Sequence, residues 1–392
     1  MSVVIIGAGQ AAAQLVTSLR QGGFGGAIHM IGDEAYAPYQ RPPLSKKFLS
    51  ERPAPETLYF RPEALWREQG VVLDFGIPAA AIDRAARSVT LADGRAVPYE
   101  TLVLATGTRA RDLAVPGAQL PGVFSLRKID DVRRLRAPLD DARRVVIVGG
   151  GYIGLEVAAV VRAEGREVTV LEAEERVMKR VTSPVISTFM QDFHRRRGVD
   201  VRLGARLAAV EGQVRVAQVR LADGAVLSAD VVLMAVGARP NDDLAAAAGL
   251  ATQDGVVVDE HGRTADPAIS AAGDCTRFPS RRYGRALRLE CVQNAIDQAK
   301  AVAAAILGKP QRYDPVPWFW SDQYELKLQM AGLSDGYGDA LTVGDVTQAR
   351  FSVEYRKDGR LIAVDAVNDG RAYMGGRRRI AQETDMVVQS SP

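Results

Sequence analysis

The sequence is poor in the residues that build covalent cross-links and metal sites. Only two cysteines, Cys275 and Cys291, occur among its 392 residues. A disulfide framework, a multi-cysteine metal site and an iron–sulfur cluster with about four ligands are therefore excluded. The closely spaced cysteine pair of disulfide-reducing enzymes is missing as well. The three histidines, at positions 29, 194 and 261, show no ligand spacing, and we expect structural or surface roles for them.

Long apolar runs and an excess of one charge are also lacking. Fifty Lys and Arg residues against 47 Asp and Glu residues give a formal charge of +3, which argues against a dedicated nucleic-acid binder. No apolar run reaches the roughly 18 residues of a membrane-spanning helix, and no basic leader precedes the first strand. We expect a cytoplasmic globular protein without a metal, a nucleic-acid partner or a membrane partner.

A glycine-rich dinucleotide-binding fingerprint is present twice. Residues 3–6 (VVII) lead into GAGQAA at 7–12, and residues 145–148 (VVIV) lead into GGGYIG at 149–154. In each copy a buried parallel strand would end in a tight turn, so that backbone N–H groups at a helix N-terminus approach a pyrophosphate. One copy alone is a weak signal, but both stand in the full strand–turn–helix context. The sequence therefore predicts two dinucleotide sites.

An acidic residue completes each fingerprint at the end of the next predicted strand. Residues 27–31 are followed by Gly32, Asp33 and Glu34, and residues 167–171 are followed by Glu172. A carboxylate in this place accepts hydrogen bonds from a ribose diol and repels a ribose phosphate. The second site therefore favours NADH over NADPH. Three nearby cations weaken this preference, since an arginine can accommodate a 2′-phosphate: Arg176, Lys179 and Arg180.

The order of elements predicts one domain interrupted by another. Apolar segments at 102–104 and 231–236 each end in small residues, and this near-repeat indicates a duplicated architecture. We assign residues 1–110 and 233–310 to a discontinuous first domain and residues 111–232 to a second.

A long helix and a third domain follow the return of the chain. Apolar residues between positions 292 and 306 recur at helical spacing, and Gly308 to Pro310 end the helix. Residues 311–392 form the third, α+β domain. In it, alternating segments around 351–355 and 361–365 flank Asp358 and Gly359 and predict an antiparallel hairpin. The polar stretch from Arg377 to Pro392 is expected to be disordered.

Several further segments resemble a known family. They are YQRPPLSK at 39–46, GGGYIGLE at 149–156, GDCTR at 273–277, residues 293–298 and PWFWSDQ at 317–323. Together they are similar to the oxygenase-coupled, NADH-dependent ferredoxin reductases of the putidaredoxin reductase-like type. Enzymes closer to glutathione reductase carry redox cysteines in place of the proline-rich segment. The resemblance spans nearly the whole chain and implies an α/β, glutathione-reductase-like fold: two Rossmann-like domains, binding FAD and then NAD, plus a C-terminal α+β domain.

The resemblance also implies the cofactor contacts. For FAD these are Gly7, Gly9, Ala11, Ala12, Asp33, Arg41, Lys46, Ala79, Thr106, Gly107, Arg109, Arg127, Asp274, Val292 and Trp320. For NADH they are Gly149, Gly151, Ile153, Gly154, Glu156, Glu172, Arg180, Gly237 and Glu290. Hydride transfer leaves negative charge on the N1 side of a flavin, and the N-terminus of the helix starting at Val292 would stabilise it.

Lys46 and Glu156 are the expected catalytic pair. In the family the matching lysine lies beside flavin N5, paired with the matching glutamate, and Glu290 joins Glu156 at the nicotinamide. The alternatives are a solvated Lys46–Lys47 surface pair and a plain helix-start acid at Glu290. Trp318 and Trp320 would line the flavin edge, or serve as ordinary core aromatics.

The implied function is electron transfer from NADH through FAD to a two-iron two-sulfur ferredoxin that supplies a cytochrome-type monooxygenase or a ring-hydroxylating dioxygenase. A rubredoxin- or nitrite-reductase-linked reductase, and an NADH-binding flavoprotein resembling apoptosis-inducing factor, remain alternatives. We expect a monomer or weak dimer. The acidic ferredoxin would dock on a basic cluster, which could instead be a solvated loop: Arg277, Arg281, Arg282, Arg285 and Arg288.

Overall fold

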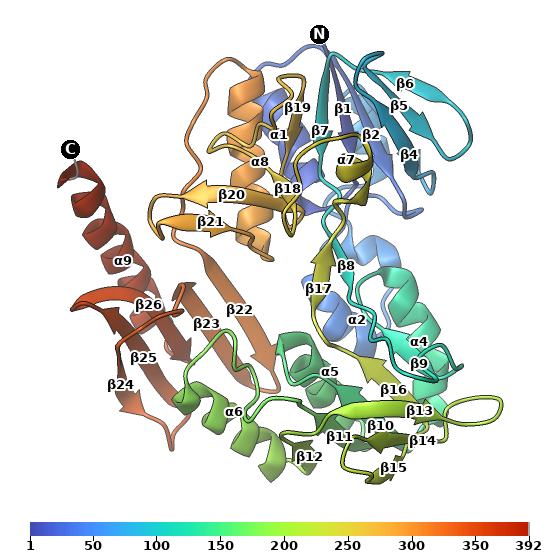
Figure 1. Cartoon of the computed structure of the whole chain (residues 1–392), viewed down its shortest axis with the longest axis vertical. Coiled ribbons are helices and arrows are strands. Elements are labelled where there is room, and N and C mark those ends of the chain that lie inside the picture. Colours follow the sequence, from blue (N-terminus) through green and yellow to red (C-terminus); the bar gives the residue numbers. More distant parts are fainter. Residues whose placement is uncertain (391–392) are drawn as a thin grey trace. The chain divides into compact units, whose positions relative to one another are not determined.

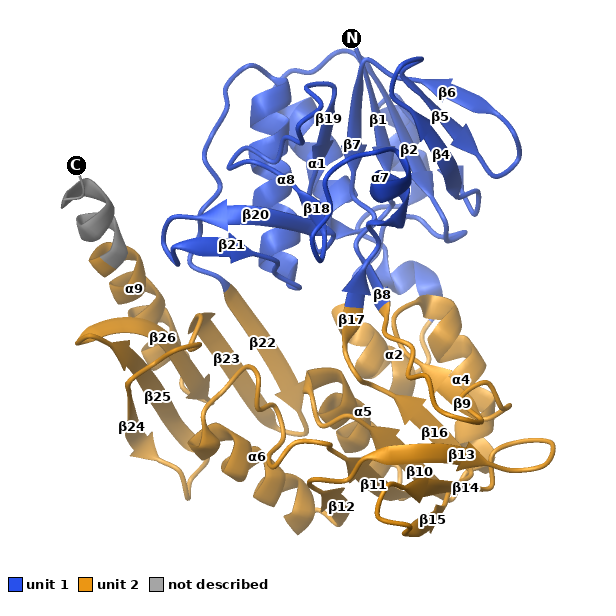
Figure 2. Ribbon diagram, in the orientation of Figure 1, with its two compact units in different colours: residues 1–40, 54–109, 239–317 blue, residues 41–53, 110–238, 318–392 orange. Residues whose placement is uncertain are grey.

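The computed structural model describes the backbone of residues 1–390 and the side chains of residues 1–383. The chain forms two compact units (Figure 2). Unit 1 contains residues 1–40, 54–109 and 239–317, and unit 2 contains residues 41–53, 110–238 and 318–392. Within the described residues, none of the helices combines the length and the apolar character needed to cross a membrane.

Unit 1 is built on a five-stranded parallel sheet (Figure 1). In spatial order its strands are β19 (Ile269–Ala271), β7 (Thr101–Leu104), β1 (Ser2–Ile6), β2 (Ala27–Gly32) and β3 (Val71–Phe75). The helices α1 (Gln10–Gln21) and α8 (Val292–Ile306) pack against each other and cover the sheet. The strands are near-continuous apolar runs because a parallel sheet is buried on both faces. The predicted strands and the predicted long helix are confirmed here.

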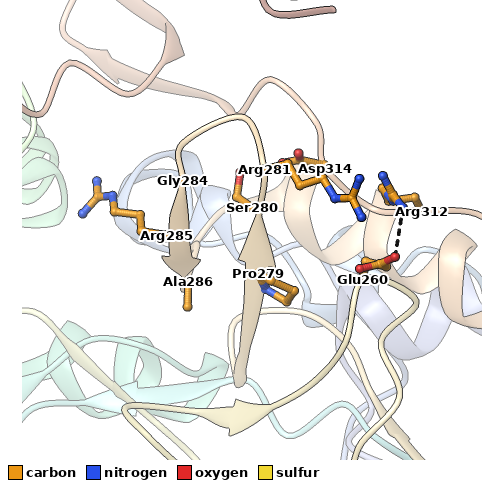
Figure 3. A pocket seen from close by; sticks show the side chains of 9 residues that line it. All are labelled: Glu260, Pro279, Ser280, Arg281, Gly284, Arg285, Ala286, Arg312 and Asp314. Atoms are coloured by element: carbon orange, nitrogen blue, oxygen red, sulfur yellow. Dashed lines mark hydrogen bonds and ion pairs between the residues drawn. The ribbon is translucent and has the colours of Figure 1, made fainter. Parts of the chain in front are cut away.

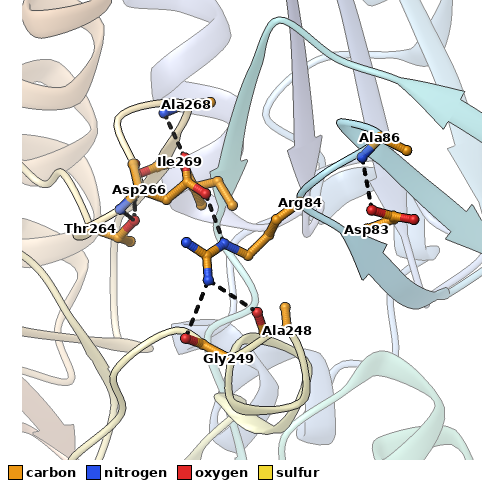
Figure 4. Close-up of polar contacts among 9 residues, drawn as sticks. All are labelled: Asp83, Arg84, Ala86, Ala248, Gly249, Thr264, Asp266, Ala268 and Ile269. Carbon is orange, nitrogen blue, oxygen red and sulfur yellow. Dashed lines mark hydrogen bonds and ion pairs between the residues drawn. The ribbon is translucent and has the colours of Figure 1, made fainter.

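Smaller elements complete unit 1. They are the antiparallel strands β4 (Ala79–Asp83), β5 (Ser88–Leu91) and β6 (Ala96–Pro98), the strands β18 (Val256–Val257), β20 (Thr276–Ser280) and β21 (Arg285–Leu287), and the short helices η2 (Pro55–Leu58), α3 (Glu63–Glu68) and α7 (Asp243–Ala247). Arg84, directly after β4, joins its own segment to the residues after α7 and to those before β19 (Figure 4). Its Nε donates to Asp266 at 2.8 Å, and its Nη1 reaches the carbonyls of Ala248 and Gly249, both at 3.4 Å.

Unit 2 repeats the parallel arrangement. Its five-stranded sheet runs in the order β12 (Val199–Arg202), β11 (Glu167–Leu171), β10 (Arg144–Val148), β16 (Val231–Met234) and β9 (Val123–Ser125). The fingerprint strand β10 lies between β11 and β16, as β1 lies between β2 and β7. The unit also contains η1 (Pro42–Ser45), α2 (Lys47–Ser50), α4 (Ile129–Asp141), α5 (Tyr152–Ala163), α6 (Pro184–Arg196), β13 (Leu207–Glu211), β14 (Gln218–Leu221) and β15 (Val226–Ser228). The duplicated architecture is confirmed.

A five-stranded antiparallel sheet forms the C-terminal part of unit 2. Its strands are β22 (Trp318–Gln323), β23 (Leu326–Gly332), β26 (Arg360–Val367), β25 (Arg350–Lys357) and β24 (Asp339–Asp345). The predicted hairpin is β25–β26. Its turn residues Asp358 and Gly359 have φ values of 49° and 77°, which is the conformation that favours this dipeptide.

The expectation of disorder from Arg377 is wrong for the residues that the structure describes. Helix α9 runs over Gly370–Ser390 and packs on β26 and β23. Tyr373 and Ile380, two helical turns apart, are buried and anchor it. The arginines at 377–379 made the segment look unstructured, but a polar outer face is compatible with a helix that has one apolar stripe.

The compact units group the chain differently from the three predicted domains. Residues 41–53 and the C-terminal sheet fall into unit 2. The chain passes from unit 1 to unit 2 within β8 (Thr108–Ala110) and returns within β17 (Ala238–Pro240). The division into domains at 1–110 with 233–310, 111–232 and 311–392 stays a prediction.

Candidate functional site

The first glycine loop leaves a helix N-terminus open. Gly7 has a φ of +116°, and a Cβ there would lie 2.1 Å from the carbonyl oxygen of Ala105, so the turn requires glycine. Gly9 is the N-cap of α1, no side chain caps the helix, and a Cβ on Gly9 would meet nothing within 4 Å. Uncapped N–H groups facing open space fit the pyrophosphate of a dinucleotide.

The second loop has the same construction. Gly149 has a φ of +110°, and its Cβ would lie 2.3 Å from the oxygen of Ala235. Gly151 is the uncapped N-cap of α5 and also has open space around it. A Cβ on Gly154 would lie 2.1 Å from the carbonyl oxygen of Gly149, so α5 packs directly against its own loop. These residues also fit a dinucleotide.

The segment that carries Gly273 and Asp274, where the polypeptide has returned to unit 1, packs against the first glycine loop. A Cβ on Gly273 would lie 3.2 Å from the Cβ of Ala11, so the segment bearing Asp274 runs beside the first turn of α1. Gln298 of α8 fixes this turn, because its Oε1 accepts from the Gly273 N–H at 2.8 Å and from the Thr276 hydroxyl at 2.8 Å. The structure thus brings Gly273 and the predicted residue Ala11 together within unit 1. Val292 begins α8, whose residue Ala295 lies 3.9 Å from the same built Cβ.

Asn241 organises a further group of predicted residues. Its backbone N–H donates to the carbonyl of Gly107 at 2.9 Å, and its Nδ2 donates to the carbonyl of Thr106 at 2.8 Å. Its Oδ1 accepts from Arg109 at 2.6 Å, and Arg109 also pairs with Asp243 at 2.6 Å. Sequence reasoning missed Asn241, since its only signal is its place directly after Pro240 at the end of a short strand.

Lys46 and Glu156 form an ion pair in unit 2. Lys46 Nζ lies 2.7 Å from Glu156 Oε2, and the two side chains are 19% and 5% exposed. The same oxygen accepts from the Ser45 hydroxyl at 2.5 Å, and Oε1 accepts from the Ser321 hydroxyl at 2.7 Å. The pairing contact is present, and Lys46 is not part of a solvated surface pair. Ser45 and Ser321 were not singled out from the sequence, although each stands inside a quoted motif.

Other predicted residues of unit 2 also meet. Arg41 Nη1 donates to the carbonyl of Arg127 at 2.8 Å, and the Arg127 N–H donates to Asp131 at 2.9 Å, which places both arginines at the start of α4. The rings of Trp318 and Trp320 are 5.8 Å apart on β22, and both side chains are partly exposed.

The acid after β11 is turned toward its own loop. Glu172 accepts from the Gly150 N–H at 2.8 Å and from the Glu174 N–H at 2.9 Å. Of the nearby cations, Arg176 donates to Thr182 and Ser187, and Lys179 pairs with two acids. Arg180 lies closest to Gly237, since its guanidinium is 3.5 Å from the position of a built Cβ there.

The predicted FAD residues are divided between the units. Arg41, Lys46, Arg127 and Trp320 are in unit 2, and the others are in unit 1, where Asp33 follows β2 and Ala79 begins β4. The predicted NADH residues are all in unit 2 except Glu290. Glu290 lies in unit 1 before α8 and pairs with Arg288. Exposed Ile153 is on the first turn of α5.

The predicted docking cluster lies on and beside the β20–β21 hairpin. Arg281 and Arg285 are exposed and extend to opposite sides of it (Figure 3). The positive charge of Arg288 is compensated, because its guanidinium pairs with Asp254 and Glu290. A hollow of about 400 Å³ beside the hairpin is lined by Glu260, Pro279, Ser280, Arg281, Gly284, Arg285, Ala286, Arg312 and Asp314. None of the predicted nucleotide contacts lines it.

The surroundings of both cysteines disfavour the thiolate form. Cys275 is fully buried, and burial raises the pKa of its thiol. Cys291 caps α8 by accepting from the Asn294 N–H at 3.4 Å, and burial raises the pKa of its thiol to about 12. A protonated thiol is a poor nucleophile. Among the described residues, no three His, Cys, Asp or Glu side chains lie together as a metal site.

Comparisons with known proteins agree with this geometry. The family model for pyridine nucleotide-disulphide oxidoreductases matches residues 1–299, and the model for the reductase C-terminal domain matches residues 318–390. Rhodocoxin reductase of Rhodococcus erythropolis is 43% identical over 392 residues, covering 100% of this chain and 92% of the relative. Putidaredoxin reductase CamA of Pseudomonas putida is 43% identical over 373 residues, covering 94% and 88%. A rubredoxin-NAD(+) reductase of the same species is 37% identical over 369 residues, covering 94% and 96%.

Solved structures give the same result. The ferredoxin reductase for the CYP199A2 system from Rhodopseudomonas palustris superposes with a TM-score of 0.94 at 45% identity, covering 96% of this chain and 93% of that one. Putidaredoxin reductase in its covalent complex with putidaredoxin gives 0.93 at 42% identity, covering 97% and 92%. The chain therefore belongs to the pyridine nucleotide-disulphide oxidoreductase family and is an FAD-dependent oxidoreductase that uses NAD(H).

Proposed function

We propose that the protein passes electrons from NADH through FAD to a two-iron two-sulfur ferredoxin, which supplies a cytochrome-type monooxygenase or a ring-hydroxylating dioxygenase. The observation that carries this proposal is the presence of two nucleotide folds without a redox-active cysteine pair. FAD, when bound, would supply a hydride acceptor that can also release electrons singly, which suits a one-electron carrier. Family members with this whole-chain similarity include rhodocoxin reductase and putidaredoxin reductase.

The two glycine loops divide the nucleotides between them. In this proposal the loop at Gly7 and Gly9 holds the FAD pyrophosphate, with Asp33 at the ribose and Asp274 near the phosphates. The loop at Gly149 and Gly151 holds NADH. Open space at both uncapped helix N-termini supports this assignment.

The Lys46–Glu156 pair orients the reacting edges. The ammonium of Lys46 is held by a carboxylate that three groups contact from two directions: Lys46 itself, Ser45 and Ser321. An ion pair whose carboxylate is buried and accepts hydrogen bonds at both oxygens has little freedom to reorient. It therefore fixes donors and acceptors for the flavin edge and for the nicotinamide carboxamide, so that the transfer depends on proximity and orientation.

Glu172 supports a preference for NADH. Its carboxylate lies at the loop, bonded to the Gly150 N–H, where it would repel a 2′-phosphate. Arg176 and Lys179 have partners of their own. Among the three nearby cations, Arg180 is therefore the candidate to accommodate a 2′-phosphate.

A carrier panel tests the proposal. Cytochrome c reduction by the flavin-loaded protein is measured with NADH or NADPH, and with several two-iron ferredoxins or a rubredoxin. Strong acceleration by one ferredoxin, with NADH preferred, is the expected result. Rapid reduction of the flavin without acceleration by any ferredoxin would count against it. Acceleration by rubredoxin alone would favour the second candidate, a rubredoxin reductase, to which the 37% identical relative points.

We further propose that the ferredoxin docks on the β20–β21 hairpin. Arg281 and Arg285 are exposed there, and complementary charge raises the encounter rate of an acidic partner in a salt-dependent way. The double variant Arg281→Gln/Arg285→Gln should raise the ferredoxin KM about fivefold at low salt, with flavin reduction by NADH unchanged. The control Arg133→Gln/Arg143→Gln removes equal charge from exposed positions in unit 2. Equal KM values for the two double variants would refute the docking site.

A further inference from the structure

A buried chain of hydrogen bonds leads away from Glu156. Ser321, whose hydroxyl donates to Glu156 Oε1, accepts from Gln323 Nε2 at 3.1 Å. Gln323 Oε1 in turn lies 2.8 Å from His194 Nε2. Counted over the whole residue, the exposed fractions of Glu156, Ser321, Gln323 and His194 are 4%, 1%, 1% and 0%. The hydride-transfer role proposed above accounts only for the first member of this chain.

The hydrogen bonds that lead from His194 to Glu156 all run in the same direction. An amide oxygen only accepts, so His194 Nε2 must carry a hydrogen. His194 Nδ1 is buried and has no partner among the described residues, and burial is the main cause that lowers the pKa of His194, with a smaller contribution from Arg197. The ring is therefore neutral with its proton on Nε2. Every donor in the chain points toward the carboxylate of Glu156.

Strand β22 positions the residues of this hydrogen-bond chain. Side chains alternate along a strand, so Phe319, Ser321 and Gln323 share one face, and Trp318 and Trp320 occupy the other. On the first face Phe319 packs against Tyr152 of α5 with ring centroids 4.7 Å apart. His194, on α6, packs against Tyr324, the residue after β22, at 5.3 Å. The strand thus joins the helix that bears Glu156 to the helix that bears His194 (Figure 1).

We propose that Ser321, Gln323 and His194 are positioning residues that fix the carboxylate of Glu156 for its partner Lys46. This inference rests on the proposed role of the Lys46–Glu156 pair in flavin reduction. Without the Ser321 hydroxyl, Oε1 loses the donor that holds it, and the carboxylate can rotate about its terminal torsion, which is a soft one. Gln323 and His194 act one step further away, by orienting that hydroxyl.

Stopped-flow reduction of the flavin-loaded protein by NADH tests the proposal. Ser321→Ala and Gln323→Leu should each lower the limiting rate constant about fivefold to tenfold, with less effect on the Kd for NADH. The control is Tyr355→Phe, which removes a buried hydroxyl that donates to Asp365 elsewhere in unit 2. It should leave the limiting rate constant unchanged while testing the loss of a comparable buried hydrogen bond.

The histidine ring provides a readout independent of turnover. Only three histidines occur, so ¹⁵N-histidine labelling gives few ring signals, and His194→Phe identifies the signal of His194. The wild type should show a neutral ring protonated on Nε2. Ser321→Ala and Glu156→Gln should both shift this signal, although neither residue touches the ring, because coupled hydrogen bonds polarise one another. Tyr355→Phe should not shift it.

The outcomes separate the two proposals. If Glu156→Gln reduces flavin at the wild-type rate, the proposed role of Glu156 fails and the positioning role falls with it. If Glu156→Gln is slow but Ser321→Ala and Gln323→Leu are not, only the positioning role is overturned. An unmoved His194 signal in Ser321→Ala would remove His194 from the chain.

Discussion

The two glycine loops share a backbone but differ in how they are closed. The third small position is Ala12 in unit 1 and Gly154 in unit 2, where a Cβ would lie 2.1 Å from the carbonyl oxygen of Gly149. The second loop also carries a carboxylate from its own unit, Glu172, on the N–H of Gly150. The second loop is thus packed more tightly and braced by its own acid. A nucleotide that binds and leaves in each turnover gains from a loop that keeps its shape while empty.

The largest effect is expected from breaking the first loop. Gly7→Val introduces a branched side chain at a φ of +116° and within 2.1 Å of a carbonyl oxygen. We expect protein without bound FAD, a loss of affinity of about a thousandfold or more. The flavin content of the purified protein, read from its absorption spectrum, measures this. Gly25→Ala, which adds a methyl group in unit 1 where nothing lies within 4 Å, is the matched control, and full flavin content in Gly7→Val would contradict the assignment.

Adding a methyl group to the second glycine loop should leave FAD bound and weaken the binding of NADH. Gly154→Ala sets a methyl group against the Gly149 carbonyl at 2.1 Å and forces α5 away from its loop. We expect the Kd for NADH to rise about a hundredfold. Anaerobic flavin reduction at increasing NADH concentrations gives that Kd. Gly375→Ala on α9 adds the same methyl group where nothing lies within 4 Å. Loss of FAD from Gly154→Ala would reverse the assignment of the loops.

The two units also contain carboxylates that respond oppositely to pH. In unit 1 the pKa of Asp74 is lowered, chiefly by its hydrogen bonds with Arg95. In unit 2 burial raises the pKa of Asp365 to about 6, although Thr182 and Tyr355 donate to it. A raised folded-state pKa means that the stability is present below the unfolded pKa and is lost as pH rises through the folded one.

Asp365→Asn should remove this pH dependence. The amide oxygen can accept from the same two hydroxyls without a buried charge. The difference in the free energy of unfolding, variant minus wild type, should increase by about 2 to 3 kcal/mol from pH 4 to pH 7. Urea unfolding at both pH values measures the difference, in which the contributions of the other carboxylates cancel. The same difference at both pH values would show that Asp365 does not titrate in this range.

The smallest effect concerns the acid of the second loop. Glu172→Ala removes the charge that would repel a 2′-phosphate and also the brace on Gly150. We expect the ratio of kcat/KM values for NADH and NADPH to fall about tenfold. Steady-state kinetics with both nucleotides measures this ratio. The control Glu174→Ala removes an acid that pairs with Lys179 nearby, and an equal change in both variants would assign the preference to general charge.

The sequence predicted the parts of the molecule that repeat or have a period. The strands before Gly7 and Gly149, the helix from Val292 and the β25–β26 hairpin follow from apolar spacing and turn residues. Contacts between single polar residues have no such signature. Asn241 and the chain from Glu156 to His194 depend on residues far apart in sequence that meet only after folding. For the same reason His194 looked like an isolated histidine.

Because unit 1 is built from separate parts of the sequence, the two units complete their folds at different times during synthesis. Its sheet begins with β1, but β19 and α8 leave the ribosome only after every strand of the second parallel sheet has been made. Domains generally fold during synthesis as their residues emerge. Unit 1 cannot close until α8 pairs with α1, so the nascent chain presents an unfinished first nucleotide fold while the parallel sheet of unit 2 is already complete. With FAD on the first loop, as proposed, we expect its uptake to be a late event, and a chain truncated before Val292 would lack the helix that covers α1.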